Sequence, residues 1–125
     1  MTYEYKIIVR GYELDSYNHV NNAVYLNYTE QARWEILKIN GLIEQFKKNK
    51  HFLVITETHI RYIREALLFD EITIYTNIEF HAPYLIFKHG LYNQHHQKLA
   101  RSTVKTLLID EHKIAQDIPN ELRNA

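Results

Sequence analysis

Residues 15–22 of the chain, DSYNHVNN, bring an aspartate, a histidine and three asparagines together just before an aromatic-rich segment. The residues that follow predict a helix that begins near Asn22, so Asp15 is expected close to the free backbone N–H groups that open this helix. Those groups and the helix dipole can stabilise a developing oxyanion. A carboxylate beside them can attack an activated acyl carbonyl or activate a water molecule. A thioester suits this chemistry, because its thiolate leaving group needs little acid assistance.

The same residue types also have ordinary structural uses. Asp, Ser and Asn before a helix are preferred as caps and turn formers. A histidine such as His19, near the start of a helix, most often packs or bonds locally. Residue types alone therefore leave both the catalytic and the structural interpretation of Asp15 and His19 open.

Other catalytic arrangements have weaker support in the sequence. The two serines, Ser16 and Ser102, do not lie in a G-x-S-x-G motif. The sequence has no Gly-rich phosphate-binding loop. Three histidines have no acidic or thiol partner at a metal-binding spacing, so we expect them in turns and expect no metal site: His95, His96 and His112.

The elements that must position Asp15 follow from the hydrophobic pattern. Residues 2–10 are rich in β-formers, and apolar residues at steps of three and four predict a helix over residues 22–40 with Gly41 as its C-terminal cap. Strands are predicted at residues 53–63, 71–80, 85–92 and 99–110, and a short helix at residues 119–124. This order predicts an α+β domain, with an antiparallel sheet packed on one principal helix.

The long helix is apolar over much of its circumference, which indicates that a curved sheet or a partner chain covers most of it. Glu30 and Arg33 lie three positions apart on this helix and are expected to form an ion pair. The apolar stripe expected to face the core consists of Tyr25, Tyr28, Ala32, Ile36 and Ile39.

The bulk composition limits the class of protein. At 125 residues and 15.1 kDa, residues 1–125 are expected to form one domain. The formal net charge is zero, so no nucleic-acid partner is expected, and self-association is favoured. The lack of cysteine excludes a disulfide scaffold and a thiolate nucleophile. No apolar run approaches the roughly 20 residues that span a membrane, so we expect a cytoplasmic protein that does not bind membranes.

Residues 14–33, LDSYNHVNNAVYLNYTEQAR, resemble the signature of hotdog-fold acyl thioesterases of the 4-hydroxybenzoyl-CoA thioesterase type. That signature runs as Asp, three residues, His-Val-Asn-Asn, two residues, Tyr, two residues, Tyr, then Glu and Ala-Arg. Plant acyl-ACP thioesterases carry a similar His-Val-Asn-Asn segment. The segments IRYIREALLFDEI and DIPNEL extend the similarity over nearly the whole chain.

The resemblance implies a single hotdog domain, in which a curved antiparallel five-stranded sheet wraps around one long central helix, plus a short C-terminal segment. It further implies a homodimer or homotetramer with active sites at the interface between protomers. By position, Asp15 inherits the role of nucleophile or general base, and the backbone N–H of Asn22 inherits the oxyanion hole. His19 matches a histidine that the plant-type enzymes are thought to use.

The resemblance also implies an acyl-CoA substrate and no separate cofactor, because coenzyme A is part of that substrate. Tyr25, Arg61 and Arg64 are the predicted substrate-binding residues. Lys88 and His89 are further candidates to meet the phosphates of coenzyme A.

The sequence departs from the family pattern at four positions. Asn22 stands where another branch of the family has its own catalytic histidine. Asn18 and Phe69 stand where glycine is common, and Ala66 stands where proline is common. The predicted function is a thioester hydrolase that acts on a fatty or aromatic acyl-CoA. Two alternatives remain open, a non-catalytic module that binds acyl-CoA or acyl-carrier protein, and a hotdog dehydratase that uses a histidine. The sequence leaves the acyl chain, the leaving group and the choice between dimer and tetramer unassigned.

Overall fold

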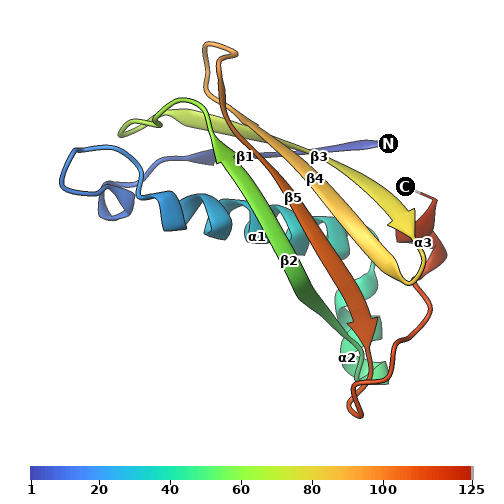
Figure 1. Ribbon diagram of the computed structural model, residues 1–125. Coiled ribbons are helices and arrows are strands. Elements are labelled where there is room, and N and C mark those ends of the chain that lie inside the picture. The colour runs from blue at the N-terminus through green and yellow to red at the C-terminus, as the bar shows by residue number, and fades with distance from the viewer. Residues whose placement is uncertain (125) are drawn as a thin grey trace.

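The computed structural model describes residues 1–124 and contains five strands and three α-helices (Figure 1). The strands are β1 (Thr2–Ile8), β2 (Phe52–Tyr62), β3 (Glu71–His81), β4 (Tyr84–Tyr92) and β5 (Lys98–Ile109). The helices are α1 (Asn22–Ile39), α2 (Leu42–Asn49) and α3 (Asn120–Arg123), and a 3-10 turn, η1, spans Gly11–Glu13. The α+β class and the predicted strands are confirmed, each within about two residues at its ends.

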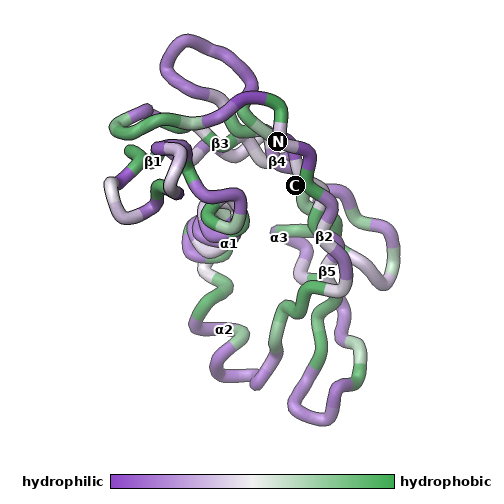
Figure 2. The backbone as a smooth tube through the Cα atoms, turned by 60° about the vertical axis from the view of Figure 1, so that its left-hand side comes forward, coloured by the Kyte–Doolittle hydropathy of each residue, from purple (hydrophilic) through white to green (hydrophobic). Residues whose placement is uncertain are grey.

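The five strands form one antiparallel sheet in the order β1-β3-β4-β5-β2. Figure 2, which looks nearly along α1, shows the sheet curving around this helix. Alternate residues of β3, β4 and β5 are buried against α1, as the period of two requires. Strand β2 lies at an edge and pairs only with β5 within the described residues, and both of its faces are largely exposed.

Helix α1 begins and ends where the local residue types favour it. The side chain of Asn21 accepts a hydrogen bond from the backbone N–H of Ala23 at 3.0 Å and caps the first turn. Gly41 follows the helix with φ of 67°, a left-handed conformation that glycine adopts without strain. The predicted stripe is buried except at Ile39, which lies in the last turn of α1 and is exposed.

The sequence pattern did not predict helix α2. It spans eight residues, so its buried positions, Leu42 and Phe46, supply only one repeat of the helical period. Because Gly41 separates it from α1, α2 turns away from the axis of α1 and covers the lower end of the sheet (Figure 1).

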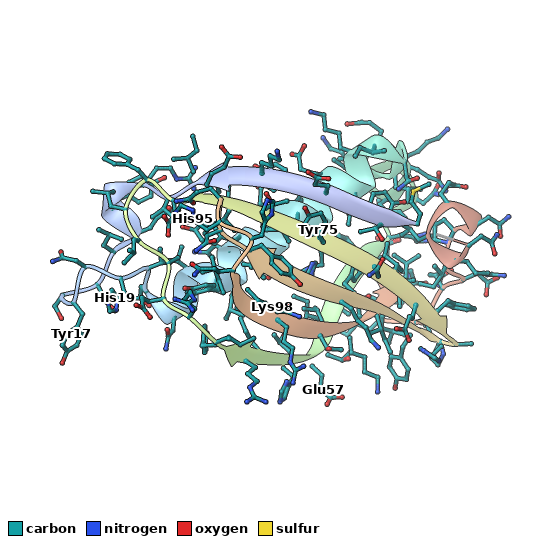
Figure 3. The ribbon with its side chains drawn as sticks, turned by 90° about the horizontal axis from the view of Figure 1, so that it is seen from above. Tyr17, His19, Glu57, Tyr75, His95 and Lys98 are labelled. Carbon is teal, nitrogen blue, oxygen red and sulfur yellow. The ribbon has the colours of Figure 1, made fainter. Side chains whose placement is uncertain are left out.

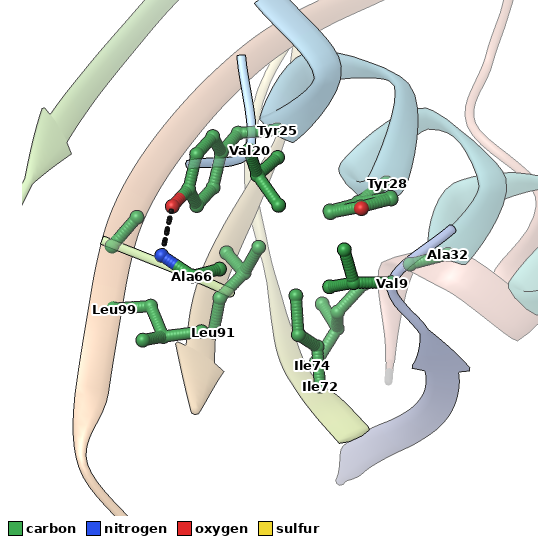
Figure 4. Close-up of a cluster of buried hydrophobic side chains, with 11 residues drawn as sticks. Val9, Val20, Tyr25, Tyr28, Ala32, Ala66, Ile72, Ile74, Leu91 and Leu99 are labelled. Atoms are coloured by element: carbon green, nitrogen blue, oxygen red, sulfur yellow. Dashed lines mark hydrogen bonds between the residues drawn. The ribbon is translucent and has the colours of Figure 1, made fainter. Parts of the chain in front are cut away.

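The core consists of two apolar clusters that follow one another along α1. The first lies beside the amino-terminal half of α1 and appears in Figure 4. The second lies beside the carboxy-terminal half of α1, α2 and α3. Members of the first include Tyr25, Tyr28, Ile72, Ile74 and Leu91, and members of the second include Ile36, Leu42, Ile78, Phe87 and Leu108.

A row of buried polar side chains separates the two clusters. Thr76 on β3, His89 on β4 and Ser102 on β5 lie opposite one another in the register of the sheet. Arg33 reaches this row from α1, where its Nη1 donates to His89 Nε2 at 3.2 Å. The predicted ion pair between Glu30 and Arg33 is therefore wrong, because Arg33 faces the sheet while Glu30 faces solvent. These four residues, Arg33, Thr76, His89 and Ser102, are called the polar row below.

Candidate active site

A tight loop before α1 carries Asp15. Leu14 and Val20 form an isolated bridge, and the backbone N–H of Asp15 donates to the carbonyl of His19 at 2.8 Å. Asn18 closes the turn by donating its N–H to the carbonyl of Asp15 at 3.0 Å, and it holds φ of 63°. Asparagine tolerates this left-handed conformation, which explains how it replaces the glycine common at this position. Tyr17, at the tip of the loop, points away from the sheet (Figure 3).

Backbone amides hold one oxygen of the Asp15 carboxylate. Its Oδ1 accepts hydrogen bonds from the N–H groups of Tyr17 at 2.9 Å and His19 at 3.2 Å. Within the described residues Oδ2 accepts no hydrogen bond, so this oxygen is available to a substrate or a water molecule. The side chain is half-buried. This geometry orients the carboxylate and leaves one of its oxygens free to react.

A buried glutamate anchors the loop to the helix. Glu13 Oε1 accepts from the hydroxyl of Tyr28 at 2.7 Å, and Glu13 Oε2 pairs with Arg10 Nη2 at 2.7 Å. The backbone carbonyl of Glu13 also accepts the N–H of Asn21 at 2.9 Å. Burial opposes the charged form of Glu13, but the hydrogen bonds from Arg10 and Tyr28 outweigh it and lower the pKa of the carboxyl. The same burial and the bond to Glu13 raise the pKa of Tyr28.

The first turn of α1 leaves one amide without a partner. Ala23 N–H donates to the side chain of Asn21, and Val24 N–H donates to the carbonyl of Asn21 at 2.9 Å. Among the residues that the structure describes, the N–H of Asn22 donates to no protein atom. The carbonyl of Asn22 accepts from the hydroxyl of Tyr62 at 2.8 Å, which fixes the end of β2 against the start of the helix. The structure thus brings Asp15 and Asn22 together at one end of α1, with an unoccupied donor there.

The other predicted site residues occupy different environments. His19 is half-buried and bonds Asp15 through its backbone, while Arg61 and Arg64 are exposed at the end of β2. Tyr25 is 2% exposed, and its hydroxyl accepts the N–H of Ala66 at 3.1 Å (Figure 4). Burial raises the pKa of the Tyr25 hydroxyl. The substrate contacts of Tyr25, Arg61 and Arg64 stay predictions, and Tyr25 in this structure holds the segment before β3.

Two expectations about histidines have clear outcomes. His89 is 3% exposed, so its predicted contact with phosphates of coenzyme A is wrong, because it faces α1 rather than solvent. His95 and His96 lie in the turn between β4 and β5, as expected.

Within residues 1–124 no group of three metal-binding side chains occurs. In the same part of the chain no helix is long and apolar enough to cross a membrane.

The hydrogen bonds that Glu13 makes with Arg10 and Tyr28 were not predicted from the sequence. Arg10 and Glu13 lie three positions apart, a spacing that allows the reciprocal bonds of a capping box around η1. The backbone N–H of Arg10 donates to Glu13 Oε1 at 2.8 Å, so that spacing was the available signal. Glu13 also accepts a hydrogen bond from Tyr28, which is fifteen positions away in the sequence. This contact arises only in the folded chain.

A pocket of about 480 Å³ opens between α1, α2 and the edge of the sheet. Apolar side chains from α1 and β2 form much of its wall, including Trp34, Leu37 and Phe52. Arg33 of the polar row also lines it. The pocket therefore lies beside the carboxy-terminal half of α1, and the loop with Asp15 lies before the amino-terminal end.

Known proteins match this chain in sequence and in fold. A family model described as the thioesterase-like superfamily matches residues 9–125. The long-chain acyl-CoA thioesterase FadM of Escherichia coli K12 is 39% identical over 74 residues, which are 59% of this chain and 56% of that protein. A chloroplastic acyl-acyl carrier protein thioesterase of Arabidopsis thaliana is 31% identical over 77 residues, which are 61% of this chain and 40% of that protein. The chain thus spans about half of the length of these relatives, or less.

A solved structure extends the likeness over the whole fold. The YbaW probable thioesterase of Escherichia coli superimposes with a TM-score of 0.85 at 31% identity, over 97% of this chain and 93% of that chain. The predicted hotdog arrangement, a curved antiparallel sheet around one long helix, is confirmed by this match and by the strand order.

Proposed function

Because the chain belongs to the thioesterase-like superfamily, we propose that it hydrolyses the thioester bond of an acyl-coenzyme A, with Asp15 as nucleophile or general base. One observation carries this proposal. Two backbone amides hold Asp15 Oδ1, and within residues 1–124 neither Asp15 Oδ2 nor the N–H of Asn22, at the start of α1, has a hydrogen-bond partner. A reactive carboxylate and an oxyanion donor are the two parts that acyl transfer needs.

The reaction follows from these two groups. The thioester carbonyl oxygen accepts a hydrogen bond from Asn22 N–H, and the dipole of α1 stabilises the negative charge that grows on it. Asp15 either attacks the carbonyl carbon or removes a proton from the attacking water. The C–S bond then breaks, and coenzyme A leaves as a thiolate that takes up a proton. Where Asp15 attacks directly, a water molecule then hydrolyses the mixed anhydride between Asp15 and the acyl group, which restores the carboxylate. The products are a free carboxylic acid and coenzyme A, and no cofactor or metal takes part.

A second copy of the chain fits this proposal. Leu26 and Trp34 of α1 are exposed, and the neighbouring edge strand β2 has no strand beyond it within residues 1–124. A free edge beside exposed apolar side chains favours association with another chain. We propose a homodimer, or a tetramer built from dimers, in which the partner covers these side chains and closes the substrate site. Analytical ultracentrifugation at micromolar concentration tests this assembly.

The test of the proposed activity is hydrolysis of short, medium, long and aromatic acyl-CoAs, followed by the thiol released. The chain has no cysteine, so it adds no thiol signal of its own. The matched variant is Asp15→Asn, whose amide oxygen still accepts the N–H groups of Tyr17 and His19 but carries no charge. We expect turnover by the wild type and a loss of about 10²-fold or more in the variant. Full activity in Asp15→Asn would refute the assigned mechanism.

Two further measurements separate the alternatives. Dehydration of a hydroxyacyl-CoA without release of thiol, lost in His19→Gln and kept in Asp15→Asn, would favour the histidine-dependent dehydratase. Binding of acyl-CoA without turnover would favour the non-catalytic module. Hydrolysis of acyl-acyl carrier protein, but not acyl-CoA, would reassign the leaving group and keep the chemistry.

A further inference from the structure

The polar row places a cation inside the core without a counter-ion. Arg33 is 8% exposed and makes one side-chain hydrogen bond, to His89. Within residues 1–124 it forms no ion pair with a carboxylate. Burial lowers the pKa of the guanidinium, and only the more distant charge of Glu30 opposes this effect. An arginine side chain keeps its proton even so, and a buried unpaired charge is costly.

The neighbours of Arg33 cannot neutralise it. Arg33 can only donate hydrogen bonds, so His89 Nε2 must accept. His89 Nδ1 then carries the ring proton and donates a hydrogen bond to Thr76 Oγ1 at 2.8 Å. His89 is therefore neutral, and burial, helped by the nearby charge of Arg33, lowers its pKa to about 3. Ser102 Oγ is buried and has no hydrogen-bond partner in the described structure. The row thus provides neutral dipoles around Arg33 and no negative charge.

Arg33 is in contact with the pocket between α1, α2 and β2, and it has N–H groups besides the one that donates to His89. Arg33 lines this pocket, and the other titratable side chains along its wall are Glu30, Lys47 and His51. Glu30 and Lys47 are exposed, and His51 is half-buried. The rest of the wall is mainly apolar, with Thr106, whose hydroxyl donates to the carbonyl of Leu85 at 2.7 Å. The pocket is therefore apolar and positively charged, with its most deeply buried charge on Arg33.

This combination is complementary to an apolar chain that ends in an anion. Arginine binds carboxylates through two parallel hydrogen bonds, and such charge-assisted bonds are among the strongest available to a protein. Asn22 and Arg33 are eleven positions apart on α1, or about 16 Å along the helix axis. An acyl chain whose thioester lies at Asn22 must therefore be long to reach Arg33.

We propose that this pocket receives the far end of the acyl chain and that Arg33 binds a carboxylate there. The preferred substrates are then long acyl thioesters with a carboxyl group at the chain end, that is, thioesters of dicarboxylic acids. This assignment rests on the proposed thioesterase function, since it places the thioester at Asp15 and Asn22. Arg33 acts in it as a residue that determines specificity and takes no part in bond breaking.

The first test compares dodecanedioyl-CoA with dodecanoyl-CoA, which differ only in the terminal carboxylate. We expect a kcat/KM for the wild-type protein that is at least about tenfold higher with the diacid thioester. In Arg33→Met, which keeps the length of the side chain without the charge, this ratio should fall to about one. Lys47→Met is the matched control at the exposed rim of the pocket, and we expect it to keep most of the preference.

Equal or faster hydrolysis of dodecanoyl-CoA by the wild type overturns the proposal, whether or not Arg33→Met folds. The counter-ion of Arg33 would then come from another source, such as a carboxylate of a second copy. In that case Arg33→Met weakens the dimer in sedimentation and leaves substrate preference unchanged.

A binding measurement separates this proposal from the proposed function. Calorimetric titration of Asp15→Asn with the two thioesters requires no turnover. Tighter binding of dodecanedioyl-CoA by about tenfold supports the role of Arg33 even if the wild type hydrolyses nothing. Equal binding of both thioesters overturns that role even if the wild type is an active thioesterase.

Discussion

His89 couples the stability of the fold to pH. It is buried in the polar row between Arg33 and Thr76, and its pKa of about 3 lies far below its ordinary value of 6.5. The unfolded chain takes up a proton on this side chain as the pH falls through 6.5, while the folded chain stays unprotonated down to about pH 3. Acid therefore favours the unfolded state, and stability contributed by neutral His89 is lost as the pH falls below 6.5.

The size of the effect follows from linkage. Between the two pKa values the free energy of unfolding falls by about 1.4 kcal/mol for each pH unit. At pH 5, one and a half units below the ordinary pKa of histidine, His89 alone accounts for a loss of about 2 kcal/mol. This is a large share of the roughly 5–15 kcal/mol that stabilises a typical domain.

Urea unfolding at a series of pH values measures this loss, and fluorescence of the single tryptophan, Trp34, reports it. The variant is His89→Gln, whose amide can accept from Arg33 and donate to Thr76 without titrating. The difference in unfolding free energy between variant and wild type should shift by about 2 kcal/mol between pH 7.5 and pH 5. His59→Gln, at an exposed position on β2, should show no comparable shift. Identical pH profiles for the wild type and His89→Gln would refute the reasoning.

Four further substitutions, one of them a control, test other parts of the structure. Glu13→Gln removes the charge that anchors the loop of Asp15 and should lower the free energy of unfolding by about 1–3 kcal/mol in urea titrations. Phe69→Gly should raise it by about 0.5–1 kcal/mol, because Phe69 holds φ of 65° while its side chain is 74% exposed. Asn18→Gly, at φ of 63°, is the control and should raise it less, because asparagine tolerates this conformation. Tyr62→Phe deletes the bond to the carbonyl of Asn22 and should cost about 1 kcal/mol by thermal unfolding, whereas an unchanged melting temperature would show that this bond adds nothing.

Much of the fold could be predicted because local patterns agree with it. The period of two along β3 and the period near 3.6 along α1 each gave the correct element. Helix α2 was missed because eight residues contain too little periodicity. The pairing of β2 with β5 was also outside the reach of local patterns, since it joins segments that are distant in the chain and skips β3 and β4.

The local geometry of the candidate site was predictable where its residues are contiguous, while their roles stay predictions. Asp15 and Asn22 lie in one short segment, and the positions of caps and turns follow from residue type. The left-handed conformations at Asn18 and Phe69 also agree with the glycines expected there. The polar row could not be predicted, because Arg33 and His89 are fifty-six positions apart and meet only through the curvature of the sheet.

The distance between the loop of Asp15 and the pocket at Arg33 has a consequence for how such a protein can evolve. Substitutions that lie well apart and share no partners have effects that add almost independently. Changes along the pocket wall, at positions such as Leu37 or Phe52, can therefore alter the shape of the pocket while the proposed reactive groups, Asp15 and Asn22, keep their geometry. Related proteins with this fold can therefore acquire new substrate preferences through single substitutions in the pocket, without changes to the residues around Asp15.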